Sequence, residues 1–218
     1  MTDRYFEKKK NQNNFKEKVD FIEFIEYYKY GNKIKGAIKM KLLTSNKNKL
    51  KEFKRFGIPN IEMALGKDIK EVDSDPITVA VYKSLDSGED TVIEDTSLHV
   101  EGADIGVNVR WLFENLGNYN GNKAVWEVLL AHNDGVEINI YQGKVKGRIT
   151  NAFEDLEGFG FDKYFIPESV EKTLCELESD GKKDLFSARR IAVDNLINKK
   201  PIKTVKIADV EKWKGAYQ

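Results

Sequence analysis

The sequence predicts an α/β protein, a mixed unit in which short apolar strands alternate with amphipathic helices. From Met40 onward, apolar runs alternate with segments whose apolar residues recur at helical spacing. Turns rich in glycine, proline, asparagine and aspartate separate these segments. With 218 residues and 40% apolar content, the chain can bury one substantial core or two lobes of one compact unit.

The first half of the pattern begins with a strand over residues 41–44 and a helix over 47–56, which Gly57 ends. The turn 73–76 supplies a cap and a proline for a second helix. The inward faces of these helices carry Leu50 and Phe53, then Ile77, Ala80, Val81 and Leu85. A buried strand over 91–93 follows and delivers two acids to its carboxyl end, where ligands usually lie in open α/β sheets.

The second half is predicted to hold two helices, a hairpin, a strand and a last helix. Apolar residues at helical spacing mark each of the three helices. They are Val109, Leu112, Phe113 and Leu116 in the first, Val125, Val128 and Leu129 in the second, and Ala188, Ile191, Ala192 and Leu196 in the last. The turn 133–135 ends the second helix, and Pro201 follows the last. Residues 136–141 pair with 144–149 as a hairpin across Gln142-Gly143, and a strand spans 163–166.

Two domains are predicted, an amino-terminal extension over 1–39 and the main domain over 40–218. The extension is charged and amide-rich, and its apolar residues from Phe15 to Tyr28 indicate an amphipathic helix ending near Gly31. This segment is interpreted as a packed or partly disordered extension, with a partner-binding helix as the alternative. Met40 is also a candidate alternative start.

Composition excludes several classes of function. Lysine plus arginine equals aspartate plus glutamate at 36 each, so no global basic field points to duplex nucleic acid. The single cysteine, Cys175, excludes an internal disulfide and fits a reducing cytosol. With only His99 and His132, histidine-rich metal chemistry is not expected. Neither a membrane span nor a secretory signal is found, so a cytoplasmic location is expected.

Three short segments predict a nucleotide site. The turn Thr44-Ser45-Asn46-Lys47-Asn48-Lys49 lies between a strand and a helix, where free backbone N–H groups and lysines suit phosphate. Glu94-Asp95-Thr96 places adjacent acids after an apolar strand, as a divalent metal and a hydrolytic water require. Gly158-Phe159-Gly160-Phe161-Asp162 is an aromatic turn that can offer a flat face to a base.

Each candidate residue also has an ordinary structural interpretation. Glu71 is a metal ligand or a solvated loop charge, and Glu94 with Asp95 could instead cap a helix. Two close acids repel and raise one pKa unless a cation such as Mg²⁺ lies between them. Surface charge is the alternative for the candidate cations, which are Lys49, Lys83, Arg110 beside Trp111, and Lys183 with Ser187, Arg189 and Arg190.

In their order, these motifs resemble the inosine triphosphate pyrophosphatase family from Lys41 to about Leu196. That family hydrolyses non-standard purine nucleoside triphosphates to the monophosphate and pyrophosphate. Its Thr-Gly-Asn-x-x-Lys opening appears as 44–49, its Glu-Asp-Ser/Thr as 94–96, and its Phe-Gly-aromatic-Asp as 159–162. The resemblance implies an elongated, two-lobed fold around a central mixed β-sheet with flanking helices, a nucleotide cleft between the lobes, and commonly a homodimer.

The resemblance also implies roles for individual residues. Glu71 and Asp95, with Glu94 in support, would hold Mg²⁺, or Mn²⁺ in its place. Asp95 or its partner Glu94 would orient and deprotonate a water for attack at the α-phosphorus. The residues that would bind the triphosphate are Thr44, Ser45, Asn46, Lys49, Lys83, Thr96 and Arg110. Those that would wall or contact the base are Phe159, Gly160, Phe161, Asp162, Lys183, Ser187 and Arg189.

The chain departs from the family pattern at several positions. Ser45 replaces the usual glycine, Arg110 stands where lysine is common, and 151–154 replaces the Pro-Arg-Gly loop. The family's Ser-His-Arg is here Ser187-Ala188-Arg189, which removes a group that reads the keto face of the purine. A lost base contact can change selectivity by orders of magnitude, so an altered base preference is expected.

Three alternatives stay open at this point. A nucleotide-binding regulatory protein would bind triphosphate tightly and release little pyrophosphate. An interaction module would act through residues 1–39. The related septum-inhibition-type nucleotide pyrophosphatases share a similar architecture, but their serine-rich opening motif is not found at 44–49.

Overall fold

The computed structural model describes residues 40–64, 69–103, 115–151 and 160–217. These residues lie within one unit of the chain, residues 38–218. The predicted extension 1–39 and most of the predicted helix stripe 109–116 lie outside them. No helix in the described ranges is long and apolar enough to cross a bilayer.

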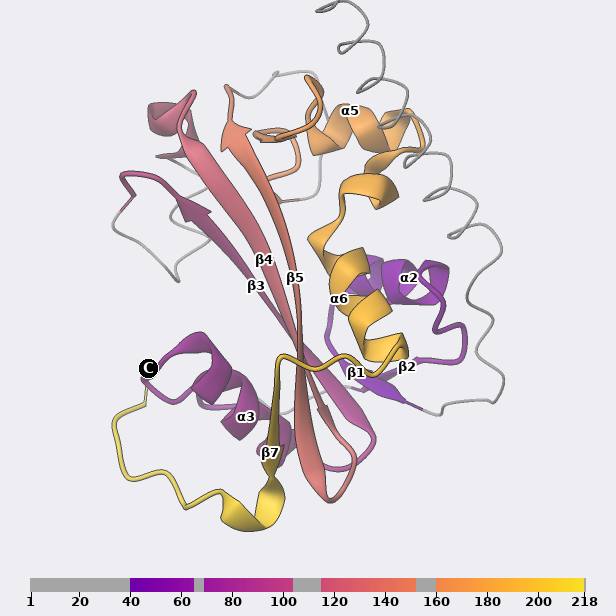
Figure 1. Cartoon of the computed structure of the whole chain (residues 1–218), viewed down its shortest axis with the longest axis vertical. Coiled ribbons are helices and arrows are strands. Elements are labelled where there is room, and N and C mark those ends of the chain that lie inside the picture. The colour runs from indigo at the N-terminus through magenta and orange to yellow at the C-terminus, as the bar shows by residue number, and fades with distance from the viewer. Residues whose placement is uncertain (1–39, 65–68, 104–114, 152–159, 218) are drawn as a thin grey trace, which may run out of the picture. The chain divides into compact units, whose positions relative to one another are not determined.

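A mixed sheet forms the centre of this unit and has seven strands in the described residues. Six of them follow the order β2-β1-β3-β4-β5-β6, and β7 pairs with β5 outside this order. The strands are β1 (Lys41–Leu43), β2 (Glu62–Ala64), β3 (Thr91–Val100), β4 (Lys123–Asn133), β5 (Glu137–Ile149), β6 (Phe165–Pro167) and β7 (Lys203–Lys206). β1 runs parallel to both β2 and β3, whereas β3, β4, β5 and β6 are antiparallel neighbours. β7 pairs with the first part of β5 and β6 with its last part (Figure 1). The predicted α/β class with a central mixed sheet is confirmed.

Helices cover both faces of the sheet. The α-helices are α2 (Lys47–Arg55), α3 (Pro76–Ser87), α5 (Leu174–Ser179) and α6 (Ala188–Ile197), and short 3₁₀ turns span Leu116–Tyr119, Lys183–Phe186 and Ile207–Asp209. α2, α5 and α6 pack over one face and α3 over the other (Figure 1). We call these the α6 face and the α3 face.

Each face carries its own hydrophobic core. The core of the α6 face includes Val92, Val128 and Tyr141, and that of the α3 face includes Ile93 and Leu129. Because successive side chains of a strand point to opposite faces, even-numbered residues of β3 and β4 lie on the α6 face and odd-numbered ones on the α3 face. This alternation decides where each functional residue of β3 points.

Three predicted segments differ from the structure. The buried strand predicted over 91–93 is the start of β3, which runs through Val100, so the two acids lie within a strand rather than at its end. The helix predicted over Val125 to Leu129 is part of β4. In this strand, residues 128–131 are buried on both faces, so the alternation of a strand is lost and the spacing imitates a helix.

The hairpin predicted across Gln142-Gly143 is also wrong, because β5 runs without interruption from Glu137 to Ile149. Gly143 does not form a turn. A Cβ at this position would collide with the backbone of α6, at the Ala188 carbonyl and 2.7 Å from the Ala192 amide nitrogen. The glycine therefore allows the helix to lie directly against the strand.

The predicted helices at 47–56 and 188–196, and the helix predicted after the turn 73–76, are confirmed as α2, α6 and α3. α3 begins as expected, because Asp75 accepts hydrogen bonds from the Ile77 and Thr78 amides at 3.0 and 3.1 Å and Pro76 occupies the first turn. In α6, Ala188 and Ala192 are fully buried, whereas the predicted inward residue Ile191 is 38% exposed.

Loss of the Asp75 cap is expected to destabilise the protein modestly. Asp75→Ala leaves two amides of the first turn of α3 without their acceptor, which should lower the free energy of unfolding by about 1 kcal/mol. Urea denaturation measures this loss. Asp86→Ala, an exposed substitution in the same helix, is the control, and equal losses in the two variants would contradict the capping role.

Candidate functional site

The predicted phosphate turn joins β1 to α2. Asn46 is the N-cap of α2, and its Oδ1 accepts hydrogen bonds from the Asn48 and Lys49 amides at 2.9 and 3.4 Å. The Asn46 amide donates to Thr44 Oγ1 at 3.0 Å. Among the described residues other than glycine, positive φ angles occur at Asp90 and Lys199, so Ser45 replaces the family glycine without backbone strain.

The register of the sheet brings this turn beside the two acids. β1 pairs with β3 as far as Leu43 opposite Ile93, and the chain then leaves the sheet at Thr44. Glu94 and Asp95 are the next two residues of β3, and on this side β1 no longer covers them. The edge of β3 beyond β1 is therefore where groups on the two faces of the sheet can reach one ligand.

Glu94 points to the α6 face and binds two cations. Its side chain is 1% exposed, its Oε2 lies 2.6 Å from Lys49 Nζ, and its Oε1 accepts from Arg189 Nε and Nη2 at 3.0 and 2.9 Å. Thr96 Oγ1 also donates to Oε1, at 2.7 Å. Burial alone would raise the pKa of Glu94, but Arg189 and Lys49 lower it to about 2. Glu94 is thus a permanent anion between a phosphate-turn lysine and an arginine of α6.

The same network continues to the predicted base-binding residues. Arg189 Nη1 bonds Glu52 of α2, and Glu52 Oε1 also lies 3.5 Å from Lys183 Nζ. Lys183 donates to Asp162 Oδ2 at 2.6 Å, with both side chains nearly buried. Burial would lower the pKa of Lys183, but the anionic neighbours, Asp162 above all, raise it.

Six buried or half-buried side chains therefore form one chain of alternating charge. In order they are Asp162, Lys183, Glu52, Arg189, Glu94 and Lys49. It runs from the predicted base pocket to the predicted phosphate turn. Charges at this depth are tolerated only when each is paired and hydrogen-bonded.

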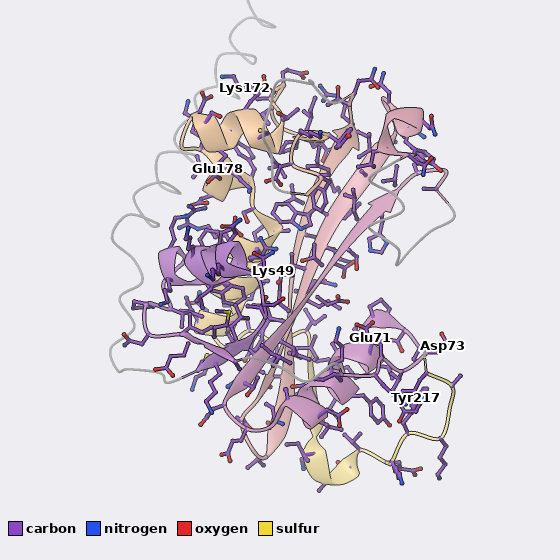
Figure 2. All side chains as sticks on the ribbon, turned by 180° about the vertical axis from the view of Figure 1, so that it is seen from behind. Lys49, Glu71, Asp73, Lys172, Glu178 and Tyr217 are labelled. Atoms are coloured by element: carbon purple, nitrogen blue, oxygen red, sulfur yellow. The ribbon has the colours of Figure 1, made fainter. Side chains whose placement is uncertain are left out.

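Asp95 points to the other face, toward α3. Burial raises the pKa of its carboxyl group, Glu71 and Glu94 raise it further, and Lys83 of α3 opposes the rise. Lys83 Nζ itself lies 2.7 Å from Glu71 Oε1. In Figure 2, Lys49 beside α2 and Glu71 beside α3 lie on different sides of the strands. The predicted pair of adjacent acids is thus divided between two charge clusters.

The carboxylate ligands available on the α3 face fit a hard divalent cation. Glu71 and Asp95 offer carboxylate oxygens, are both partly buried and interact with each other electrostatically. Among the described residues, no group of three or more His, Cys, Asp or Glu side chains is arranged to hold a metal. Mg²⁺ commonly takes one or two protein carboxylates and completes its shell with water and substrate phosphates. Two carboxylates therefore suffice if the triphosphate supplies other ligands.

The remaining predicted site residues divide into three groups. Phe161 is buried next to Asp162, whereas Gly160 is exposed with a φ of 62°. Ser187 has a structural role as the N-cap of α6, because its Oγ accepts a hydrogen bond from the Arg190 amide at 3.2 Å. Arg110 and Phe159 lie outside the described residues.

Sequence reasoning missed Glu52, which joins the two halves of the charge network. It lies three residues after Lys49 in α2, so both face the same side of the helix. A buried acid on the inner face of an amphipathic helix is the signal that could have identified it.

Comparison with known protein families matches residues 40–199 to the Ham1 family. A dITP/XTP pyrophosphatase from Hyperthermus butylicus is 30% identical over 177 residues, which cover 71% of this chain and 90% of that protein. The enzyme of the same name from Thermococcus kodakarensis is 29% identical over 164 residues, covering 66% and 88%.

Solved structures agree in fold. The Staphylococcus aureus Ham1 protein superimposes with a TM-score of 0.60 at 22% identity, covering 74% of this chain and 97% of that one. A Ham1 protein from Coxiella burnetii gives a TM-score of 0.54 at 19% identity, with the same coverage.

The mixed sheet and these matches thus define the predicted class of enzyme, a hydrolase of nucleoside triphosphate anhydride bonds with a mixed α/β fold. The chain belongs to the Ham1 family. The predicted resemblance to the inosine triphosphate pyrophosphatases is confirmed by this match and by the relatives' shared name.

Proposed function

We propose that this chain hydrolyses a purine nucleoside or deoxynucleoside triphosphate to the monophosphate and pyrophosphate, in a Mg²⁺-dependent reaction. The observation that carries the proposal is the register of β1 against β3, which places the phosphate turn beside Glu94 and Asp95. The names of the relatives, dITP/XTP pyrophosphatases, support the same substrate class.

In the proposed reaction, a water attacks the α-phosphorus and the bond from that phosphorus to the α,β-bridging oxygen breaks. Asp95 orients the water and accepts its proton, and pyrophosphate leaves. Mg²⁺, held by Glu71 and Asp95, would supply positive charge to the phosphates. Lys49 and Lys83 neutralise the triphosphate from the two faces of the sheet, together with the N-terminus of α2.

In this proposal Glu94 positions other groups instead of binding the metal. Both of its oxygens already contact cations, and its side chain faces away from the Glu71 cluster. It would hold Lys49 toward the phosphates and Arg189 toward the base. Changes at the base end of the network would then reach the phosphate turn through Glu94.

The strength of selection among bases is proposed to differ from that of relatives with the Ser-His-Arg motif. Ala188 is fully buried and offers no donor in place of the histidine. A base-binding site that lacks one hydrogen bond can lose one to two orders of magnitude in discrimination.

Pyrophosphate release from a panel of ribo- and deoxynucleoside triphosphates tests the proposal. We expect release of pyrophosphate rather than phosphate with at least one 6-keto purine, its loss in EDTA and its return with Mg²⁺. Equilibrium dialysis with the same nucleotides should be run in parallel. Tight binding without turnover on any member would instead support a nucleotide-binding regulatory protein.

A further inference from the structure

Trp126 lies against two residues of the predicted base pocket. It belongs to β4, points to the α6 face and is only 2% exposed. Its ring packs edge-on against Phe161, with centroids 5.6 Å apart, and the Arg189 guanidinium carbon lies 6.0 Å from its centroid. These two neighbours are residues that the sequence predicts to contact the base.

The indole nitrogen of Trp126 is a buried donor with no hydrogen-bond acceptor among the described residues. An indole N–H can donate and cannot accept. Buried donors in folded proteins almost always have an acceptor, and a missing partner costs about 1–3 kcal/mol. An unpaired donor at this position is therefore a specific feature that needs an explanation.

Other donors of the pocket are already engaged. Arg189 bonds Glu94 and Glu52, and Lys183 bonds Asp162 at 2.6 Å. Ala188, at the position of the family histidine, has no side-chain donor. The Trp126 N–H, by contrast, has no ion pair or acceptor among the described residues to give up when it binds a ligand.

We propose that Trp126 is a specificity-determining residue whose indole N–H donates a hydrogen bond to the 6-keto oxygen of a bound purine. The proposal rests on the proposed function. A keto oxygen satisfies the donor, whereas the 6-amino group of adenine would present a second donor at the same place. Trp126 would in this way supply part of the selection for keto purines that the loss of the histidine removes.

Binding of inosine monophosphate and of purine riboside monophosphate, which lacks the 6-oxygen, tests this role by calorimetry. Wild type is expected to bind the inosine nucleotide at least about tenfold more tightly. Trp126→Phe keeps the ring contact with Phe161 and removes the N–H, so this preference should fall about tenfold. Trp213→Phe is the matched control, because Trp213 donates its N–H to the Ala216 carbonyl near the end of the chain.

An unchanged preference in Trp126→Phe, or no preference in wild type, would overturn the proposal and leave the hydrolase intact. An equal loss of affinity for the two nucleotides in the variant would also overturn it. Such a result would mean that the indole N–H binds N7 of the base or a water instead of the 6-oxygen. No binding of either nucleotide to wild type, with no pyrophosphate release, would instead reject the proposed function itself.

A fluorescence measurement tests the same contact without changing Trp126, so it does not depend on the folding of Trp126→Phe. The chain has three tryptophans, so Trp111→Phe combined with Trp213→Phe leaves Trp126 as the one emitter. Its emission should change wavelength with inosine monophosphate more than with purine riboside monophosphate. Identical responses to the two nucleotides would contradict the keto contact.

Discussion

Asp95→Asn is expected to lower the rate of pyrophosphate release by at least about a thousandfold. Asparagine fills the same volume opposite Leu129 and preserves the β3–β4 register. It carries no negative charge, so it can neither accept the proton of the attacking water nor hold a cation with Glu71. Steady-state kinetics at saturating Mg²⁺ should show the loss mainly in kcat.

The same substitution should make the metal-free protein more stable at neutral pH. The pKa of Asp95 is raised in the folded state, mainly by burial, so its charged form opposes folding. A carboxyl group with a raised pKa favours folding only at low pH, and this benefit is lost as the pH rises through the folded-state pKa. Asparagine removes that pH-dependent penalty.

Asp86→Asn, an exposed change on α3, is the control for both effects. Thermal unfolding in EDTA measures the stability, and pyrophosphate release measures the activity. A variant at position 95 that keeps wild-type turnover would reject Asp95 as the acceptor of the water's proton. A metal-free stability that drops would show that its charge supports the fold.

Glu94→Gln is expected to destabilise the fold by about 3–5 kcal/mol. The neutral amide leaves Arg189 with one anionic partner, Glu52, and removes the carboxylate 2.6 Å from Lys49. Removing one member of a buried charge network costs far more than the network contributes as a whole, because the remaining charge stays buried and uncompensated. Chemical denaturation at pH 7 gives the loss directly.

The pH dependence of stability should change in the same variant. Glu94 has a pKa of about 2 in the folded protein against an ordinary value of 4.5. A lowered folded-state pKa stabilises the fold above about pH 4.5, and the contribution, about 3 kcal/mol, is lost as the pH falls toward 2. Glu94→Gln should therefore show a flatter decline of stability over this range.

Glu101→Gln, an exposed change just after β3, provides the comparison. It should alter neither the stability at pH 7 nor the slope below pH 4.5. If Glu94→Gln and Glu101→Gln behave alike, the ion pairs of Glu94 with Lys49 and Arg189 do not stabilise the protein.

The helices were the most predictable part of the fold, because their signals are local. In α3, the cap at Asp75, the proline after it and the apolar stripe of Ala80 and Val81 all occur within one segment. In α2, Asn46 and Gly57 mark the two ends in the same way. Each of these features acts through neighbours in the sequence, so no tertiary contact is needed to see them.

The long strands were less predictable, because burial on both faces removes the alternation of apolar and polar residues that marks a strand. The spacing of apolar residues in β4 predicts a helix because both faces of this strand are apolar. Gly143 predicts a turn within β5, whereas it lets α6 lie close to the strand. β2, β7 and α5 were missed, since such short elements depend on their neighbours for stability.

For the site, the sequence by itself determined which chemical groups are present. The phosphate turn, the adjacent acids and the aromatic turn are contiguous motifs, and their order identified the family that the comparison confirms. Motifs of this kind can be read from the sequence because their residues are consecutive, as at a helix N-terminus, where neighbouring backbone N–H groups face one ligand.

Only the tertiary structure decided how these groups are divided and connected. Because side chains alternate along β3, Glu94 joins Lys49 and Arg189 on one face while Asp95 joins the Glu71 cluster on the other. Glu52 of α2 and Trp126 of β4 contact these groups through packing and belong to none of the three contiguous motifs. Pairing of charges that lie 95 and 137 residues apart is set by the shape of the core, and no local sequence signal records it.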